Sequence, residues 1–277
     1  MSPMAGETFA NEAGNKSKDF LWLHLRELPY FRALLRAVEA RFYQELNLPT
    51  PILDVGCGDG HFAGVAFEKP LDVGIDPWRE MLPHARAYGG YRLVIQGLGS
   101  ELPFAANEFA SVISNSVLEH IPQVDEVLRE IHRVLRPGGW FVFCVPNHRF
   151  PQELSVSKFF ERLGLKQLAR TYSRFFNRIS RHHHCDDVPV WRKRLETTGF
   201  ILERYWHYFP PTALHALEWG HYFGLPSLVA RWLTGRWVLV PTSWNLALTR
   251  RLVQRFYDES PVCENGVYSF YIAYKAE

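Results

Sequence analysis

The sequence predicts an α/β fold: a Rossmann-like, doubly wound and mainly parallel sheet of seven strands, with an antiparallel final strand and helical insertions. Two observations lead to this prediction. Short apolar runs alternate with helix-patterned segments between residues 50 and 146, which is typical of βαβ units. Two further β-rich segments lie in the second half of the chain. The 277 residues are enough to give such a sheet a full core.

The N-terminal part is predicted to lie outside the sheet. Residues 1–19 contain acids and no apolar stretch, so we expect a flexible head and no secretion signal. Residues 20–48 are expected to form a helical segment. Apolar side chains recur there every three to four positions as far as Leu46, and Pro29 should break the helix.

Five parallel strands are expected next, each marked by a short apolar run: 52–56, 71–76, 92–96, 110–115 and 140–145. Helices are expected after the first strand, over 79–88 and over 123–135, and the RPGG sequence at 136–139 should end the last of them. The segments 200–205 and 267–275 are rich in aromatic and β-branched residues. We expect them to close the sheet as a final antiparallel pair.

Residues 49–277 are predicted to form one domain with two insertions, at about 147–190 and 210–265. The charge is uneven: residues 1–146 carry 13 Lys/Arg and 18 Asp/Glu, whereas residues 147–277 carry 18 and 11, with six of the nine Trp. The basic, aromatic half is therefore expected to have a task of its own.

The cysteines and the hydropathy indicate the cellular setting. No apolar stretch is long enough to span a membrane. The four cysteines lie far apart and form no CxxC pair, which favours reduced thiols in a cytoplasmic protein over a disulfide framework or a structural zinc site: Cys57, Cys144, Cys185 and Cys263.

A glycine-rich turn follows the first strand and opens a helix. Glycines at 56, 58 and 60 allow a sharp turn and let a ligand approach the backbone. Asp76 ends the next strand, where a carboxylate can accept hydrogen bonds from ribose hydroxyls. The dinucleotide fingerprint GxGxxG needs a third glycine where this chain has His61. The order of elements predicts an adenosine-type ligand without a pyrophosphate.

Together these motifs resemble the class I S-adenosylmethionine-dependent methyltransferases, in the broad type 11-like subgroup that methylates small molecules and lipids. The resemblance covers roughly residues 50–146. It rests on VGCGDG (55–60), Asp76, ELPF (101–104), SNSVLEHI (114–121) and EIHRVLRPGGWFVF (130–143).

The resemblance implies a set of cofactor-binding residues. Asp54 would help hold the amino group of S-adenosylmethionine, and Asp76 the ribose hydroxyls. Pro77 and Trp78 would flank the adenine. Leu98 stands where the family usually has an acid near the adenine amino group, so adenine recognition would rely on backbone and apolar contact. The whole set is Asp54, Gly56, Cys57, Gly58, Gly60, Asp76, Pro77, Trp78, Leu98, Gly99, Asn115 and Ser116.

The sequence offers one candidate catalytic base and one segment that could suggest metal binding. Methyl transfer needs a general base only for a weakly acidic acceptor, and His120, after the fourth strand, is the best-placed candidate. A helix-start histidine with a local hydrogen bond is the competing interpretation. The run His182-His183-His184-Cys185-Asp186-Asp187 invites a metal interpretation, but consecutive histidines diverge in direction. We assign no metal ligands and leave open whether this loop lines the acceptor pocket or is plain surface.

The acceptor is expected to be small and lipophilic or aromatic, because 210–265 holds more aromatic residues than a small polar metabolite requires. A helix around 165–181 would carry a basic stripe opposite an apolar face. It is expected either to cap the sheet or to lie on a membrane surface. No nucleic acid partner is expected. Alternatives are a non-catalytic nucleotide-binding scaffold, a peripheral membrane protein and a nicotinamide-dependent dehydrogenase.

Overall fold

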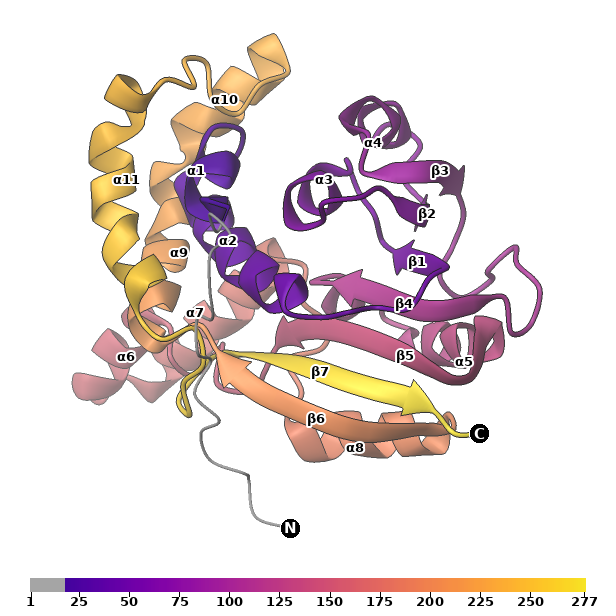
Figure 1. Ribbon diagram of the computed structural model, residues 1–277. Helices are drawn as coiled ribbons and strands as arrows, with labels where there is room; N and C mark the ends of the chain where they lie inside the picture. Colours follow the sequence, from indigo (N-terminus) through magenta and orange to yellow (C-terminus); the bar gives the residue numbers. More distant parts are fainter. Residues whose placement is uncertain (1–17) are drawn as a thin grey trace.

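The computed structural model describes residues 18–277, so the predicted head lies outside the described residues except for Lys18 and Asp19. One seven-stranded sheet forms its centre, in the order β3-β2-β1-β4-β5-β7-β6 (Figure 1). The strands are β1 Ile52–Val55, β2 Leu71–Asp76, β3 Tyr91–Gln96, β4 Phe109–Asn115, β5 Leu135–Pro146, β6 Phe200–Tyr208 and β7 Tyr268–Lys275. The first five are parallel, and β7 runs antiparallel to β5 and β6. The predicted fold class is confirmed.

The strand order reverses at β1, which pairs with β2 on one side and β4 on the other. In an open α/β sheet, the crevice at the carboxyl ends of the strands beside such a reversal is where ligands bind. Asp76 and Asn115 are the last residues of β2 and β4, so the sheet brings them to the same edge as the glycine turn after β1.

Two hydrophobic cores cover the two faces of the sheet. On one face the strands pack against the N-terminal helices α1 Phe20–Leu25 and α2 Tyr30–Gln44, and Pro29 precedes α2 as predicted. The other face packs against α5 Val124–Val134 and α8 Val188–Thr197. The short helices α3 His61–Ala66, α4 Leu82–Tyr88 and η1 Leu118–His120 follow β1, β2 and β4.

The end of α5 differs from the sequence prediction. The RPGG sequence does not end a helix that reaches residue 135. The helix stops at Val134, and Leu135 already pairs with Phe109 as the first residue of β5. A register shift between Phe109 and Ser111 accommodates the proline and glycines inside the strand. β5 is therefore five residues longer at its start than predicted.

The insertions are helical. The first contains α6 Ser155–Arg162 and α7 Lys166–Ile179, and the second contains α9 Pro211–Phe223, α10 Leu225–Thr234 and α11 Ser243–Asp258. In Figure 1, α9, α10 and α11 stand beside α1 and α2, across from α3 and α4. α10 has no buried residue. Among residues 18–277, none of the helices combines the length and the apolar character that a membrane span requires.

Candidate cofactor and acceptor site

The turn after β1 is held by backbone hydrogen bonds to β2. The amides of Gly56 and Cys57 both donate to the Ile75 carbonyl, at 2.8 and 3.1 Å. Gly56, Gly58 and Gly60 have φ values of +88°, +53° and +77°, which strongly favour glycine. The turn therefore depends on its three glycines for its shape.

The three glycines differ in what surrounds them. A Cβ on Gly56 would lie 2.5 Å from a Val117 methyl, and one on Gly60 would lie 2.8 Å from the Ala85 Cα. These two positions are closed by packing. At Gly58 no atom lies within 4 Å of the Cβ position. Gly58 is thus the point of the turn where a ligand can approach the backbone.

Two buried carboxylates flank the turn. Asp76 accepts hydrogen bonds from the amides of Gly58 and Trp78, both at 2.9 Å, so its orientation is fixed while other lone pairs remain for a ligand. Asp54 accepts a 2.6 Å hydrogen bond from the Tyr91 hydroxyl. Burial raises the pKa of Asp54 to about 7. A cationic ligand group beside Asp54 would favour its ionised form.

The end of β4 is tied to α2 by one carboxylate. Glu39, fully buried, accepts hydrogen bonds from Asn115 Nδ2 at 2.7 Å, Ser116 Oγ at 2.8 Å and Tyr208 Oη at 2.9 Å. Arg36 Nη1 lies 2.8 Å from the same carboxylate and 3.2 Å from the Asn115 carbonyl. The side chains of Asn115 and Ser116 thus hold α2 over the strand end.

The remaining predicted cofactor residues lie on loops beside the turn. Trp78 is 53% exposed, and the Arg181 guanidinium lies 5.5 Å from the centre of its ring. Pro77 and Leu98 are exposed as well, whereas Cys57 is buried. Gly99 lies in the loop after β3, where a Cβ would approach Val55 to 3.1 Å.

His61 occupies the third-glycine position without crowding the sheet. Its Nε2 lies 2.8 Å from His24 Nδ1, and its Nδ1 lies 3.2 Å from Glu27 Oε2. The ring packs 5.2 Å from that of Tyr88. The side chain therefore points toward α1 and α4 rather than between α3 and the strand.

The loop after α7 packs on η1, which follows β4. The amides of His183 and His184 donate to the Glu119 carbonyl, at 2.7 and 3.2 Å. His120 Nδ1 lies 3.0 Å from the Arg181 carbonyl, which can only accept, so Nδ1 carries the proton. A hydrogen bond from His120 to nearby backbone was expected if this histidine has a structural role and not that of a general base. Nε2 keeps a free lone pair, and burial lowers the pKa of the ring.

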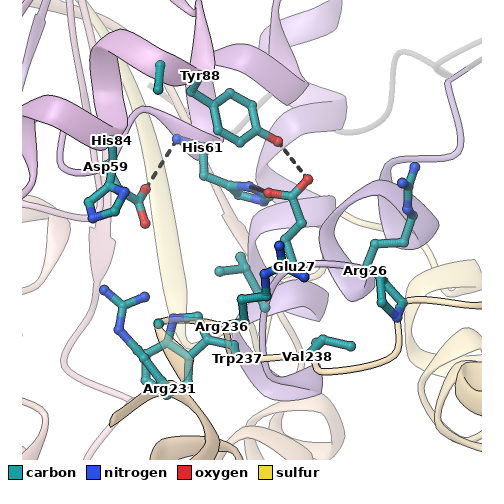
Figure 2. A pocket seen from close by; sticks show the side chains of 14 residues that line it. Arg26, Glu27, Asp59, His61, His84, Tyr88, Arg231, Arg236, Trp237 and Val238 are labelled. Atoms are coloured by element: carbon teal, nitrogen blue, oxygen red, sulfur yellow. Dashed lines mark hydrogen bonds and ion pairs between the residues drawn. The ribbon is translucent and has the colours of Figure 1, made fainter. Parts of the chain in front are cut away.

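Two adjoining cavities lie beneath the link between α10 and α11. The first, about 450 Å³, lies between Asp59 in the glycine turn, α4 and the link, with Arg26, Arg231 and Arg236 on its wall (Figure 2). The second, about 440 Å³, is mostly apolar and shares Leu28, Trp237 and Val238 with the first. Neither cavity is lined by any of the twelve predicted cofactor residues.

Comparisons with known proteins agree with this geometry. Residues 53–143 match the family model described as a methyltransferase domain. An uncharacterized methyltransferase from Mycobacterium sp. (strain JLS) is 37% identical over 37% of this chain and 43% of its own length. A ubiquinone biosynthesis O-methyltransferase from Chromobacterium violaceum is 33% identical over 35% of this chain and 44% of its own. The chain thus spans less than half the length of these curated relatives.

A solved structure shows the same fold across most of the chain. A SAM-dependent methyltransferase from Thermotoga maritima matches with a TM-score of 0.53 and 14% identity, covering 89% of this chain and 91% of that one. Residues 53–143 are a class I S-adenosylmethionine-dependent methyltransferase domain. The methyltransferase domain takes S-adenosylmethionine as its cofactor, as the sequence predicted, which disfavours the dehydrogenase alternative.

The residues of the turn fit that cofactor. The space at Gly58 is open to a ligand, and Asp54 and Asp76 are the kind of groups that bind an ammonium and two ribose hydroxyls. Sequence analysis missed Glu39, Arg36 and Tyr208. One signal was present: Glu39 lies within the apolar stripe of α2, four residues after Leu35 and three before Phe42.

Proposed function

We propose that the protein transfers a methyl group from S-adenosylmethionine to a small lipophilic acceptor. The observation that carries the proposal is an open Gly58 and an oriented Asp76 in the same structure as an apolar cavity between the N-terminal helices and α10 and α11. The relatives named for ubiquinone biosynthesis and for malonyl-[acyl-carrier protein] O-methylation support a lipid-related acceptor.

In this proposal the chain binds and orients the cofactor. When bound, S-adenosylmethionine supplies an activated methyl group, and the protein supplies alignment and a shaped site. Asp54 binds the amino group, Asp76 the ribose, and the backbone at Gly58 lies against the methionine part. Trp78, covered by Arg181, flanks the adenine. Asn115 and Ser116 lie at the end of β4, which their hydrogen bonds to Glu39 hold in place, and they form part of the cofactor site.

The acceptor would enter from beneath the α10–α11 link. The second cavity is lined by apolar side chains from α1, α10 and α11, including Leu25, Ala230 and Leu246, and from the α10–α11 link. It continues at Trp237 into the cavity beside Asp59, so it leads toward the glycine turn. His120, in η1 after β4, is the proposed base: it keeps a free Nε2, and burial lowers the pKa of the ring so that it stays neutral near pH 7.

A membrane surface is the proposed source of the acceptor. The segment 219–257 carries five arginines and no acid. Large apolar side chains of this segment are more than half exposed: Phe223, Leu225, Leu228, Val229, Trp232, Leu233, Leu239, Trp244, Leu248 and Leu252. Exposed aromatic and aliphatic groups flanked by arginine favour an anionic lipid surface. The protein would then be cytoplasmic and peripheral to the membrane.

The basic helix predicted around 165–181 is proposed as a second contact. α7 buries Ala169 and Phe176, but Leu168, Phe175 and Ile179 remain 43–49% exposed. The apolar face predicted to cap the sheet is thus only partly covered. Its arginines at 170, 174 and 178 line the neighbouring face.

Calorimetry and a partition assay test the proposal. S-adenosylhomocysteine should bind the purified chain, and Asp76→Ala should weaken binding at least about tenfold, since a charged hydrogen-bonding group is worth about 1.5–3 kcal/mol. Glu80→Ala, exposed in the same loop, is the matched control and should bind normally. With labelled cofactor and a cell extract, label should enter the organic phase. Absence of binding heat would refute the cofactor site, and label confined to the aqueous phase would refute a lipophilic acceptor.

A further inference from the structure

A cluster of three potential metal ligands lies just beyond the end of β4. Glu119, His120 and His182 each offer a ligand atom, and these atoms lie within 4.8 Å of one another. Two of them belong to η1, directly after β4, and the third comes from the loop after α7. We propose that Glu119, His120 and His182 bind a divalent transition-metal ion such as Zn²⁺.

His120 is already set in the geometry of a ligand. Its Nδ1–H donates to the Arg181 carbonyl at 3.0 Å, which leaves the lone pair on Nε2. Metal-binding histidines almost always use their second nitrogen in this way, because the hydrogen bond fixes both tautomer and ring direction. Nε2 lies 3.9 Å from Glu119 Oε1, and the side chain is 41% exposed, so an ion can reach it.

Glu119 supplies an independent reason to expect a cation. The residue is 1% exposed, and its Oε2 has no hydrogen-bond partner within the described part of the chain. Arg36 lies in the same region, but its guanidinium is bonded to Glu39 at 2.8 Å. A buried carboxylate with an unpaired oxygen is costly, and a dication bound there would remove that cost.

His182 is held toward the cluster by its own loop. Its ring packs 4.9 Å from Phe150 and 5.4 Å from His120. The next two amides donate to the Glu119 carbonyl, which fixes the loop on η1. A neutral imidazole held in this place can donate the lone pair of a ring nitrogen to a metal.

The ligand set indicates the type of ion. Two imidazoles and one carboxylate suit Zn²⁺ and other first-row transition metals rather than Ca²⁺ or Mg²⁺. Three protein ligands leave coordination positions for an acceptor oxygen. Binding uses the Nε2 lone pair that a general base would need, so the ion would replace His120 as the group that acts on the acceptor. The action of the ion on an acceptor rests on the proposed methyl transfer, whereas the binding of the ion does not.

Metal titration of the full-length protein tests the site without measuring activity. The protein is first dialysed against a chelator. Co²⁺ alone should then bind with one equivalent per chain, as measured by calorimetry and by the visible absorption of the bound ion. Zn²⁺ should displace it. Glu119→Gln and His182→Ala should each weaken binding at least about tenfold. His183→Ala is the matched control, because His183 is an exposed neighbour and bonds Glu119 through its backbone.

Thermal unfolding keeps the test decisive. Co²⁺ should raise the unfolding temperature of the wild type and of His183→Ala but not of the two ligand variants. If a variant fails to fold, His120→Ala replaces it, since His120 is exposed. Failure of the folded wild type to bind near one equivalent, or an equal loss in His183→Ala, would overturn the proposal.

Discussion

Glu39 in α2 accepts a 2.8 Å hydrogen bond from Ser116, the residue directly after β4, although 76 residues separate them along the chain. The same carboxylate binds Asn115, Tyr208 and Arg36. One acidic side chain thus joins the N-terminal helices, the end of β4 and the end of β6. The shape of the site depends on this contact.

Replacing Glu39 should therefore unfold the protein more easily. Glu39→Ala leaves the buried Asn115, Ser116 and Tyr208 without their acceptor, and removing one partner of a buried charged pair costs about 3–5 kcal/mol. Urea unfolding followed by circular dichroism measures the loss. Glu45→Ala, exposed just after the same helix, should change stability by less than about 0.5 kcal/mol. Equal stabilities for the two variants would contradict this role for Glu39.

Substitutions of the turn glycines should distinguish a position that contacts the ligand from one that is closed by packing. Gly58→Ala should cost about 1–2 kcal/mol of stability for its left-handed backbone and should also weaken S-adenosylhomocysteine binding. Gly138→Ala is the matched control: its φ is +71°, no atom lies within 4 Å of its Cβ position, and it lies in β5. It should lose similar stability and bind normally.

Gly60→Ala should behave differently, because its Cβ would meet the backbone of Ala85 at 2.8 Å. We expect a larger loss of stability than at Gly58, with α4 displaced. Calorimetry and urea unfolding on all three variants check these outcomes. Normal cofactor binding by Gly58→Ala would remove Gly58 from the site.

Asp54 should make stability depend on pH. Burial raises its pKa from 3.8 to about 7, so between those values the native state keeps a proton that the unfolded chain releases. The contribution of Asp54 to the unfolding free energy of the cofactor-free protein should fall by about 4 kcal/mol as the pH rises through this window, with the loss complete above pH 7. Asp54→Asn should remove that part of the slope.

Urea unfolding at pH 5 and pH 8 measures the slope. Burial also raises the pKa of Glu119, to about 8, so Glu119 makes stability fall with pH as far as pH 8. This part of the slope remains in Asp54→Asn. Glu80→Gln, exposed after β2, should leave the profile unchanged. Buried histidines with lowered pKa values, such as His24 and His182, give a slope of the opposite sign in both proteins, so the comparison with Asp54→Asn isolates the Asp54 part. An equal slope in the wild type and in Asp54→Asn would show that Asp54 is ionised in the folded state.

The aromatic residues of α10 and α11 should govern membrane binding. Trp232 and Trp244 are 83% and 75% exposed. Replacing both by glutamate should reduce flotation with phosphatidylglycerol vesicles on the order of a hundredfold, since burying each aromatic side chain contributes about 1.5–3 kcal/mol. Arg170→Glu with Arg174→Glu on α7 tests the second surface and should have a smaller effect. Unchanged flotation of the tryptophan variant would exclude α10 and α11 as the membrane-binding surface.

The local sequence pattern determined the positions of the strands and of the glycine turn, because these features depend on residues close together in the chain. The alternation of apolar runs placed each strand of the sheet, because strands such as β1 and β4 are almost entirely buried and are therefore mostly apolar. Gly56, Gly58 and Gly60 marked the turn, because left-handed backbone strongly favours glycine. The end of α5 was predicted wrongly, because the sheet can extend through Pro137 when Leu135 pairs with Phe109.

The tertiary structure alone decided which distant side chains meet. Glu39 reaches Ser116, Arg181 covers Trp78, and His182 approaches Glu119 and His120 because helices from both ends of the chain fold over one edge of the sheet. Consecutive histidines diverge in direction, so the run 182–184 by itself predicts no metal site. The proximity of His182 to Glu119 and His120, about sixty residues upstream, could not be predicted, because contact between separate segments is set by how they pack and not by their spacing in the chain.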